Sequence, residues 1–289
     1  MTSLLLAAAI AFTPADAREA YDSAAGLVQN CTPRDAGTIR ARLAAEWLLD
    51  RVSRLGIDAS IEKFRAHTPD GDKPFQNVVV EFKGSKEDAP WVVLMSHYDT
   101  KPGIPPPFVG ANDGASTSGL LVALAGAFRR AYRAKPFGDN VALVWTDGEE
   151  CRYGYTDKDG FQGAKELVRS YAERRRRVKA AIGLDMLGDR DLVIQIPVNT
   201  TPQLRKAAHV AAKRAGMADL VVDGREIVQD DFSQFLDAGC PAINLIDFDY
   251  GPNNSWWHST SDTLDKISES SLERSGRLVA ELMNLLESR

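Results

Sequence analysis

The chain has 289 residues, of which 44% are hydrophobic and 26% are charged. This is the composition of an ordinary folded protein, and it excludes a disordered or membrane-embedded chain. The 40 acidic residues outnumber the 35 basic ones, so the sequence offers no basic field that could hold a nucleic acid.

The first seventeen residues differ from the rest of the chain. Leu4 to Phe12 is an unbroken apolar run, and Ala15-Asp16-Ala17 fits a small-x-small cleavage site. The nine apolar residues are too few to span a bilayer, so we predict a signal peptide over residues 1–17 and a mature domain over residues 18–289. Because no Lys or Arg precedes the run, a frayed amphipathic start is the alternative. We therefore expect an exported protein, periplasmic or secreted, without an integral membrane segment.

The chain contains three cysteines, Cys31, Cys151 and Cys240. An odd number without CxxC spacing argues against a disulfide framework and against a metal bound by cysteine. In an exported protein one disulfide and three buried thiols both remain open.

Predicted strands and helices alternate along the chain. Hydrophobic residues at helical spacing from Ile39 to Leu55 predict a first helix, which Gly56 ends. Two extended segments follow near 60–65 and 76–82, on either side of a turn-rich stretch. Short continuous apolar runs then predict strands buried on both faces, at 91–95, 141–145, 180–184 and 242–246. Further helices are expected at about 113–132, 161–176, 201–215 and 268–287.

This alternation indicates one α/β domain with a largely parallel central sheet. In such sheets, ligands gather beyond the carboxyl ends of the strands. Ionisable side chains fall at these points in the sequence. They are His97 and Asp99 after 91–95, Glu149 and Glu150 after 141–145, Asp185 after 180–184, His258 after 242–246, and Asp113 at the start of the helix at 113–132. Separate segments of the chain thus deliver acids and histidines to one edge.

Such an edge favours a divalent metal. Asp113, Glu149, Glu150, Asp185 and Asp231 would bring several carboxylates into one site, where like charges raise one another's pKa. A divalent cation removes the conflict, and carboxylate oxygens with imidazole nitrogens suit zinc. Three protein ligands and an open fourth position are typical of a catalytic zinc.

Each residue has an ordinary interpretation when taken singly. A histidine at a strand end is more often a packed or surface residue, and the Glu149-Glu150 pair alone could lie in a solvated turn. The coincidence favours a site, because two of the four histidines, His97 and His258, fall at strand-end positions. The chain has no HExxH, GxSxG or Gly-rich phosphate motif, which disfavours a helix-based zinc protease, a serine hydrolase and a nucleotide enzyme.

Six ordered motifs carry a resemblance to a known family. They are Ser96-His97-Tyr98-Asp99-Thr100-Lys101, Val109-Gly110-Ala111-Asn112-Asp113-Gly114, Asp147-Gly148-Glu149-Glu150, Leu184-Asp185-Met186, Asp230-Asp231-Phe232 and Trp257-His258-Ser259. From about Tyr21 to the C-terminus the chain resembles zinc metallopeptidase family 28, which contains di-zinc aminopeptidases and the glutaminyl-peptide cyclotransferases (glutaminyl cyclases). The implied fold is a three-layer α/β sandwich, with helices on both faces of a twisted, mixed, mostly parallel sheet.

The resemblance also implies roles for individual residues. Asp113, Glu150 and His258 match the zinc ligands shared by both branches of the family, and Glu149 matches the general acid/base.

The branches differ around this shared triad. In the aminopeptidases a second zinc lies on the positions of His97 and Asp185, with Asp113 bridging. In the cyclases one zinc is usual, and Asp185 and Asp231 form hydrogen bonds around Glu149. Asp99 resembles the carboxylate that orients His97.

The sequence is nearer to the cyclase branch. The pairs Thr100-Lys101 and Asp230-Asp231, and Trp257 before the zinc histidine, favour it. Phe232, where cyclases and many aminopeptidases carry His, and Gly114-Ala115-Ser116, common in aminopeptidases, argue against it.

We therefore expect an enzyme that converts the N-terminal glutamine of a peptide or protein to pyroglutamate, with one zinc and a pocket lined by Trp257, Trp256 and Phe248. The alternative is a di-zinc aminopeptidase in which Glu149 activates a water molecule. A third hypothesis is a binding module that has lost its chemistry, which the full set of ligand and acid/base residues disfavours. We expect a monomer.

Overall fold

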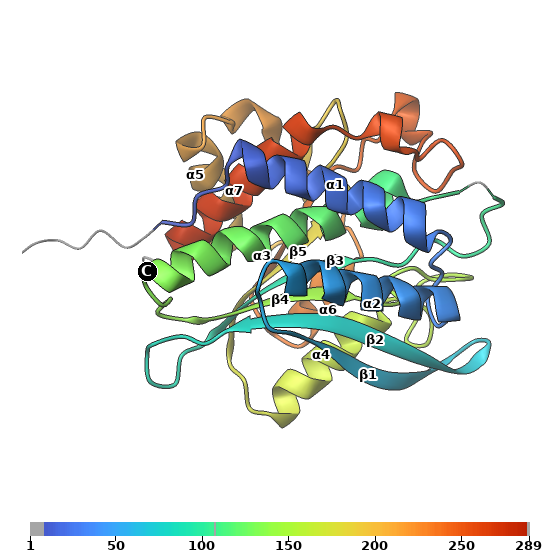
Figure 1. Ribbon diagram of the computed structural model, residues 1–289, viewed down its shortest axis with the longest axis horizontal. Helices are drawn as coiled ribbons and strands as arrows, with labels where there is room; N and C mark the ends of the chain where they lie inside the picture. Colours follow the sequence, from blue (N-terminus) through green and yellow to red (C-terminus); the bar gives the residue numbers. More distant parts are fainter. Residues whose placement is uncertain (1–8, 107, 288–289) are drawn as a thin grey trace, which may run out of the picture.

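A mixed sheet runs through the middle of the protein (Figure 1). The computed structural model describes residues 9–106 and 108–287, and in them eight strands have the order β1-β2-β4-β3-β5-β8-β6-β7. The strands are β1 (Ala59–Thr68), β2 (Gly71–Phe82), β3 (Trp91–His97), β4 (Asn140–Thr146), β5 (Val178–Asp185), β6 (Ile194–Ile196), β7 (Val221–Asp223) and β8 (Ala242–Ile246). The central strands β4, β3, β5 and β8 are parallel, whereas β1 and β2 pair antiparallel at one side and β6 pairs antiparallel with β8.

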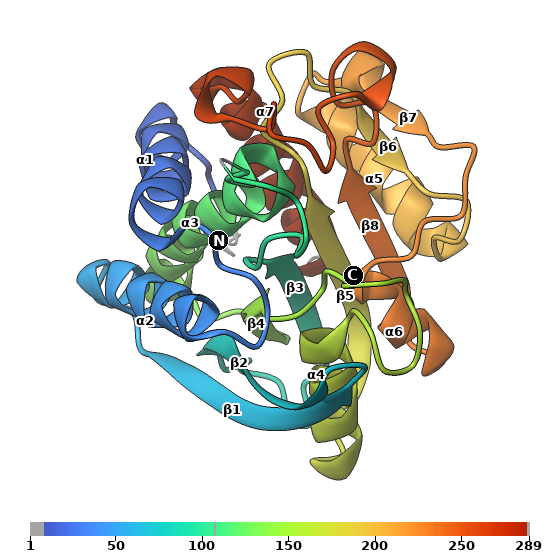
Figure 2. The same ribbon diagram turned by 90° about the vertical axis from the view of Figure 1, so that its right-hand side faces the viewer.

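Helices cover both faces of the sheet (Figure 2). One face carries α1 (Pro14–Cys31), α2 (Ile39–Arg54), α3 (Thr117–Ala134), α5 (Pro202–Arg214) and α7 (Glu269–Glu287), and the other carries α4 (Gln162–Glu173) and α6 (Asp231–Asp237). The strands alternate accordingly, because Val78 and Val80 pack in the larger core while Val79, between them, packs under α4 and α6. The predicted three-layer sandwich is confirmed.

The long predicted elements correspond closely to those observed. The four continuous apolar runs are β3, β4, β5 and β8, and the helix expected from Ile39 is α2. The predicted helix at 113–132 begins later, at Thr117, because Asp113 (φ −79°, ψ 102°) and Gly114 (φ +84°) have non-helical backbone. We did not predict α1, α6, β6 or β7.

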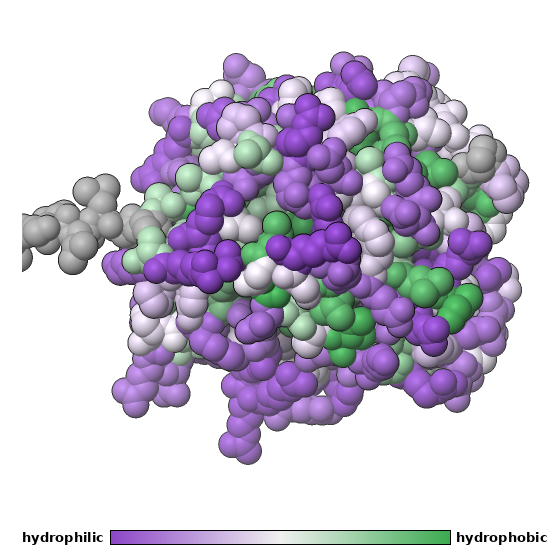
Figure 3. Space-filling view, viewed as in Figure 1, coloured by the Kyte–Doolittle hydropathy of each residue, from purple (hydrophilic) through white to green (hydrophobic). Residues whose placement is uncertain are grey.

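The solvent face of α1 and α2 is largely hydrophilic, with hydrophobic surface between polar side chains (Figure 3). Ile39 and Leu43 on α2 are 56% and 47% exposed, so they do not contribute to the core as the helical spacing suggested. All three cysteines are free thiols, which resolves the question of a disulfide. No helix among residues 9–106 and 108–287 is both long and apolar enough to cross a membrane.

The predicted cleavage point falls inside a folded segment. Residues 1–8 lie outside the described residues, but Ile10 and Phe12 are buried, and the backbone of Ile10 exchanges two hydrogen bonds with the side chain of Asn284 on α7. Thr13 caps α1 in a capping box with Asp16. A cut after Ala17 would remove these contacts, so such a cut would weaken the fold. Export and a monomeric state stay predictions.

A chain that begins at Arg18 should be less stable than one that begins at Ala9. Loss of the cap costs about 1 kcal/mol, and loss of the buried side chains of Ile10 and Phe12 removes roughly 1.5–3 kcal/mol of stabilisation each. For a domain of this size we expect a fall in Tm on the order of 10 °C. Thermal unfolding of the two chains measures this. Equal Tm values would mean that residues 9–17 are dispensable for folding.

Candidate metal centre

Asp113 lies in a tight turn that precedes α3. Residues Ala111–Ser116 form a π-helical turn, and Gly110 before it has a left-handed backbone (φ +54°). The Asp262 carboxylate accepts the backbone N–H groups of Asn112 (2.7 Å) and Asp113 (3.1 Å). Asp262 therefore fixes the backbone that presents Asp113.

A buried arginine holds the loop before this turn. The Arg34 guanidinium is fully buried and donates to the carbonyl oxygens of Tyr98, Val109 (2.7 Å) and Gly110 (2.7 Å). It joins the end of β3 to the Asp113 turn, and it adds a positive charge beneath an acidic site.

Glu149 and Glu150 follow β4 and are aligned through their backbones. Both of their N–H groups donate to the Asp99 carboxylate, at 3.2 Å each. Asp99 Oδ1 is 3.6 Å from His97 Nδ1, too far for a hydrogen bond. Asp99 therefore aligns the glutamate loop more directly than it orients His97, the role that the resemblance implied.

The predicted triad comes together at the carboxyl ends of the strands. His258 Nε2 is 2.9 Å from Glu150 Oε1 and 3.3 Å from Asp113 Oδ2. His258 has a left-handed backbone (φ +49°), and its ring stacks on Trp257 at 4.0 Å between centroids.

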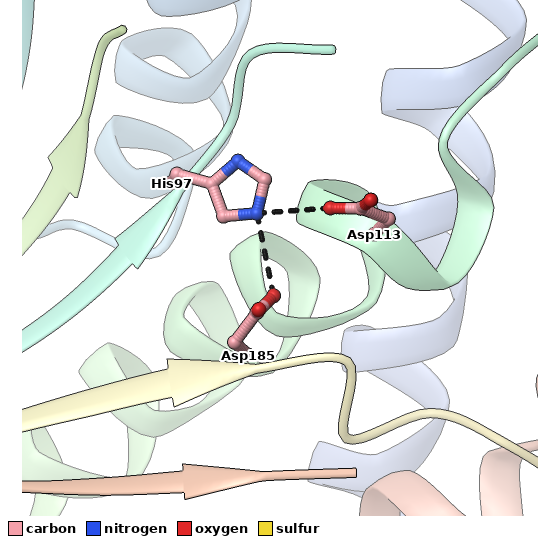
Figure 4. A group of neighbouring side chains, drawn as sticks. All are labelled: His97, Asp113 and Asp185. Carbon is pink, nitrogen blue, oxygen red and sulfur yellow. Dashed lines mark hydrogen bonds and ion pairs between the residues drawn. The ribbon is translucent and has the colours of Figure 1, made fainter. Parts of the chain in front are cut away.

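A second group shares Asp113 with the first (Figure 4). His97 Nε2 is 3.2 Å from Asp113 Oδ1 and 3.3 Å from Asp185 Oδ1. The two Asp113 oxygens thus face different histidines, which places Asp113 between the two groups as a bridge would lie.

Both groups have the geometry of metal ligands. Ligand atoms about 2.0–2.1 Å from a tetrahedral zinc lie roughly 3.3 Å from each other, close to the separations observed. In each group the three candidate ligand atoms all lie within 4.8 Å of one another. Asp113 Oδ2 is buried without a hydrogen-bond donor, as expected of an oxygen reserved for a cation. Carboxylate oxygens and imidazole nitrogens of this kind are suitable ligands for zinc.

The electrostatics show the same need for a cation. Burial raises the pKa of Asp185 to about 7, and burial together with the charge of Asp230 raises that of Asp231 to about 8. Burial and the charge of Glu150 hold the pKa of Glu149 well above its usual range. For His258 burial lowers the pKa, but the neighbouring carboxylates of Asp113 and Glu150 outweigh it and raise the pKa to about 9.

A cavity of about 320 Å³ opens over the triad. Its lining includes Asp113, Glu149, Glu150, Asp185, Asp230, Tyr155, Phe248, Trp257 and His258. Phe248 and Trp257 pack against each other at 5.0 Å and form its aromatic wall. Trp256, the third predicted pocket aromatic, lies elsewhere, because its ring packs on Tyr250 at 5.5 Å and on Gly251.

The consecutive acids Asp230 and Asp231 have different surroundings. Asp230 lines the cavity, caps α6 and accepts a hydrogen bond from Asn244. Asp231, predicted to be catalytic, is outside the lining and accepts a hydrogen bond from the Thr146 hydroxyl. We did not single out Asp230 from the sequence, although it is adjacent to the residue that we chose.

Tyr155 and Lys101 are two further residues at the site. The Tyr155 hydroxyl is 3.4 Å from an oxygen of each of Glu149 and Glu150. Lys101 Nζ is 3.2 Å from Glu150 Oε2. Lys101 ends the first of the six motifs and Tyr155 lies outside them, and the direction of neither side chain could be inferred from the sequence.

Comparison with known proteins gives consistent results. The family model described as Peptidase family M28 matches residues 77–283. A glutaminyl-peptide cyclotransferase of Drosophila melanogaster is 25% identical over 81% of this chain and 72% of its own length. The crystal structure of an Acidobacteriales bacterium glutaminyl cyclase has a TM-score of 0.86 at 31% identity and covers 95% of both chains. A leucine aminopeptidase precursor from Bacteroides thetaiotaomicron shares the fold, with a TM-score of 0.80 at 22% identity over 95% of this chain and 98% of its own.

Removing metal should make stability depend steeply on pH. The raised pKa values of Asp185 (about 7) and Asp231 (about 8) mean that the folded, metal-free protein holds protons that the unfolded chain has released near pH 4. The protons on Asp185 and Asp231 stabilise the folded state. This stabilisation is complete below pH 4 and is lost as the pH rises through 7–8. His258 acts in the same direction between about 6.5 and 9.

We therefore expect the chelated protein to have a lower Tm at pH 8 than at pH 6. Added zinc should raise Tm more at pH 8, because its ligands are then deprotonated. Thermal unfolding at both pH values, with and without zinc, measures this difference, and the zinc-loaded protein is the control. A chelated protein that is as stable at pH 8 as at pH 6 would contradict it.

Proposed function

The chain belongs to peptidase family M28, and on that premise we propose that it is a zinc-dependent glutaminyl-peptide cyclotransferase. Such an enzyme converts the N-terminal glutamine of a peptide to pyroglutamate and releases ammonia. The proposal rests on one observation above all: Glu149 lies beside the metal triad in a cavity with an aromatic wall of Trp257 and Phe248. The 31% identity with a glutaminyl cyclase over 95% of the chain supports it.

In this proposal Asp113, Glu150 and His258 hold one zinc ion. The ion supplies a Lewis acid that polarises the oxygen of a bound carboxamide. The protein binds the rest of the glutamine, and a flat carboxamide side chain suits the cavity wall of Trp257 and Phe248.

Glu149 moves the proton. The substrate's own α-amine attacks the carboxamide carbon, a C–N bond forms, and the bond to the carboxamide nitrogen breaks as ammonia leaves. Glu149 takes a proton from the amine and gives it to the leaving nitrogen, for which its raised pKa suits it. Burial and the charges of Glu150, Asp230 and Asp231 keep that pKa high. Asp185 and Asp230 line the same cavity and can hold the substrate amine. The backbone N–H of Asp231 donates a hydrogen bond to the Asp230 carboxylate.

An aminopeptidase is the second candidate, favoured by the group of His97, Asp113 and Asp185. A second zinc there would give the di-metal arrangement, and Glu149 would then activate water. The neighbour named as an aminopeptidase is only 22% identical, a level that indicates the fold alone. We therefore keep this candidate second.

The substrate is proposed to be a peptide. A further cavity of about 450 Å³ shares Tyr155, Ile227 and Gln229 with the cavity over the triad. Ile227 is 72% exposed at this shared rim, and the Asn199 side chain fixes the rim through both backbone polar groups of Val228. The peptide chain beyond the glutamine has room to continue past Ile227.

The decisive measurement is pyroglutamate formation from a Gln-initiated peptide, beside leucine release from a leucyl peptide. We expect pyroglutamate and ammonia in equal amounts, loss of activity with a chelator, and about one zinc per chain. Glu149→Gln should lower kcat by at least ~10²-fold while zinc stays bound, since general acid/base groups contribute 10²–10⁴. The control is Glu46→Gln, an exposed residue on α2. Leucine release without pyroglutamate, and two zinc ions, would favour the aminopeptidase.

Ile227→Ser should discriminate between substrates by length. For a Gln-initiated tetrapeptide with leucine at the second and third positions, we expect kcat/KM to fall about tenfold, because an apolar contact of ~1.4 kcal/mol is lost. For glutamine amide it should not change. Ile39→Ser, at a comparably exposed isoleucine on α2, is the control. An equal loss for both substrates would mean that Ile227 acts on the cavity itself.

A further inference from the structure

Glu150 uses its two carboxylate oxygens differently. Oε1 faces the metal triad, 2.9 Å from His258 Nε2. Oε2 faces Lys101 Nζ at 3.2 Å and the Tyr155 hydroxyl at 3.4 Å. We infer that Lys101 is a positioning residue that restrains Glu150 to one-oxygen binding of the metal and so keeps a coordination position open for the substrate carboxamide. This inference rests on the proposed function.

Lys101 is built into the site and is not a flexible surface lysine. Its side chain is 16% exposed, and its ammonium group is also 3.1 Å from Cys151 Sγ and 5.3 Å from the centre of the Tyr155 ring. Because a half-buried ammonium group loses hydration, it needs a partner, and Glu150 is the carboxylate within ion-pair distance.

Hydrogen bonds of the preceding residue, Thr100, fix the main chain at Lys101. Thr100 accepts the Arg34 N–H at 3.1 Å and donates to Asp35 at 2.8 Å through its hydroxyl. Lys101 therefore follows a residue that is anchored to the segment of Arg34 and Asp35, and its side chain reaches from there to Glu150.

Removing the ammonium group frees Oε2 to turn toward the metal. A carboxylate can bind a metal through one oxygen or both, and a second oxygen would occupy the position that a catalytic zinc leaves open. The Tyr155 contact at 3.4 Å is too long to prevent this alone. Removing a nearby positive charge also favours a cation at the triad. Zinc binding and catalysis should thus respond in opposite directions, whereas loss of a merely structural residue would weaken both.

The test uses the full chain with Lys101→Met, Lys101→Arg and, as the control, Lys83→Met, an exposed lysine paired with Glu81. Zinc affinity is measured by competition with a chromophoric chelator, and the oxygen neighbours of zinc by X-ray absorption. Turnover is measured on a Gln-initiated peptide. For K101M we expect zinc binding as tight as in the wild type or tighter, a shorter distance from zinc to the Glu150 carboxylate carbon as Oε2 takes the open position from water, and kcat/KM at least ~10-fold lower. K101R should recover most of the activity, and K83M should match the wild type.

Two results would overturn the inference: zinc affinity that falls at least tenfold in K101M together with activity, or unchanged activity and coordination. Should K101M not fold, K101Q removes the same charge and answers the same question. If the wild type forms no pyroglutamate, the proposed function fails. The zinc affinity and the coordination of K101M still test Lys101, because neither depends on turnover.

Discussion

The structure depends on holding several buried carboxylates together at one edge of the sheet. One cavity is lined by Asp113, Glu149, Glu150, Asp185 and Asp230, and all of these except Asp185 are buried. Burial, together with the repulsion of neighbouring carboxylates, raises the pKa values of Glu149 and Asp185 when no cation is bound. The fold tolerates this unfavourable free energy because other interactions fix the backbone around the site. A divalent ion then removes the repulsion, so metal binding and folding are thermodynamically linked.

Two acids and one arginine that do not bind metal fix that backbone. Asp99 holds the two glutamate N–H groups, Asp262 holds the turn of Asp113, and Arg34 joins the end of β3 to the loop before that turn. These contacts connect the ends of neighbouring parallel strands to the loops that carry the ligands. The parallel centre of the sheet thus brings distant segments to one edge, and the buried hydrogen bonds set the orientation of each side chain.

Much of this arrangement was predictable from the sequence, and the exceptions have physical causes. Continuous apolar runs identified β3, β4, β5 and β8, because strands buried on both faces need no polar alternation. β6 and β7 have only three residues each, too few for a periodic pattern. The alanine-rich start of α1 lacks a strong pattern and resembles the end of a leader. The strand ends indicated one edge rich in acids and histidines, and the resemblance selected the triad among them. The sequence could not show that Asp230 rather than Asp231 lines the cavity, or that Trp256 points away from it, since adjacent residues at a turn point in directions that only tertiary packing decides.

Asp113 explains why the same ligands are compatible with two chemistries. One of its oxygens faces His258 and the other faces His97, so the fold provides for a bridge whether or not a second metal is present. His97 is buried and lies outside the lining of the cavity, whereas Asp185 lines it and is shared by both arrangements. In the two proposed reactions Asp185 would hold either a second metal or the substrate amine, and burial raises its pKa to about 7. The two proposed reactions therefore share the triad and differ in what His97 and Asp185 would hold.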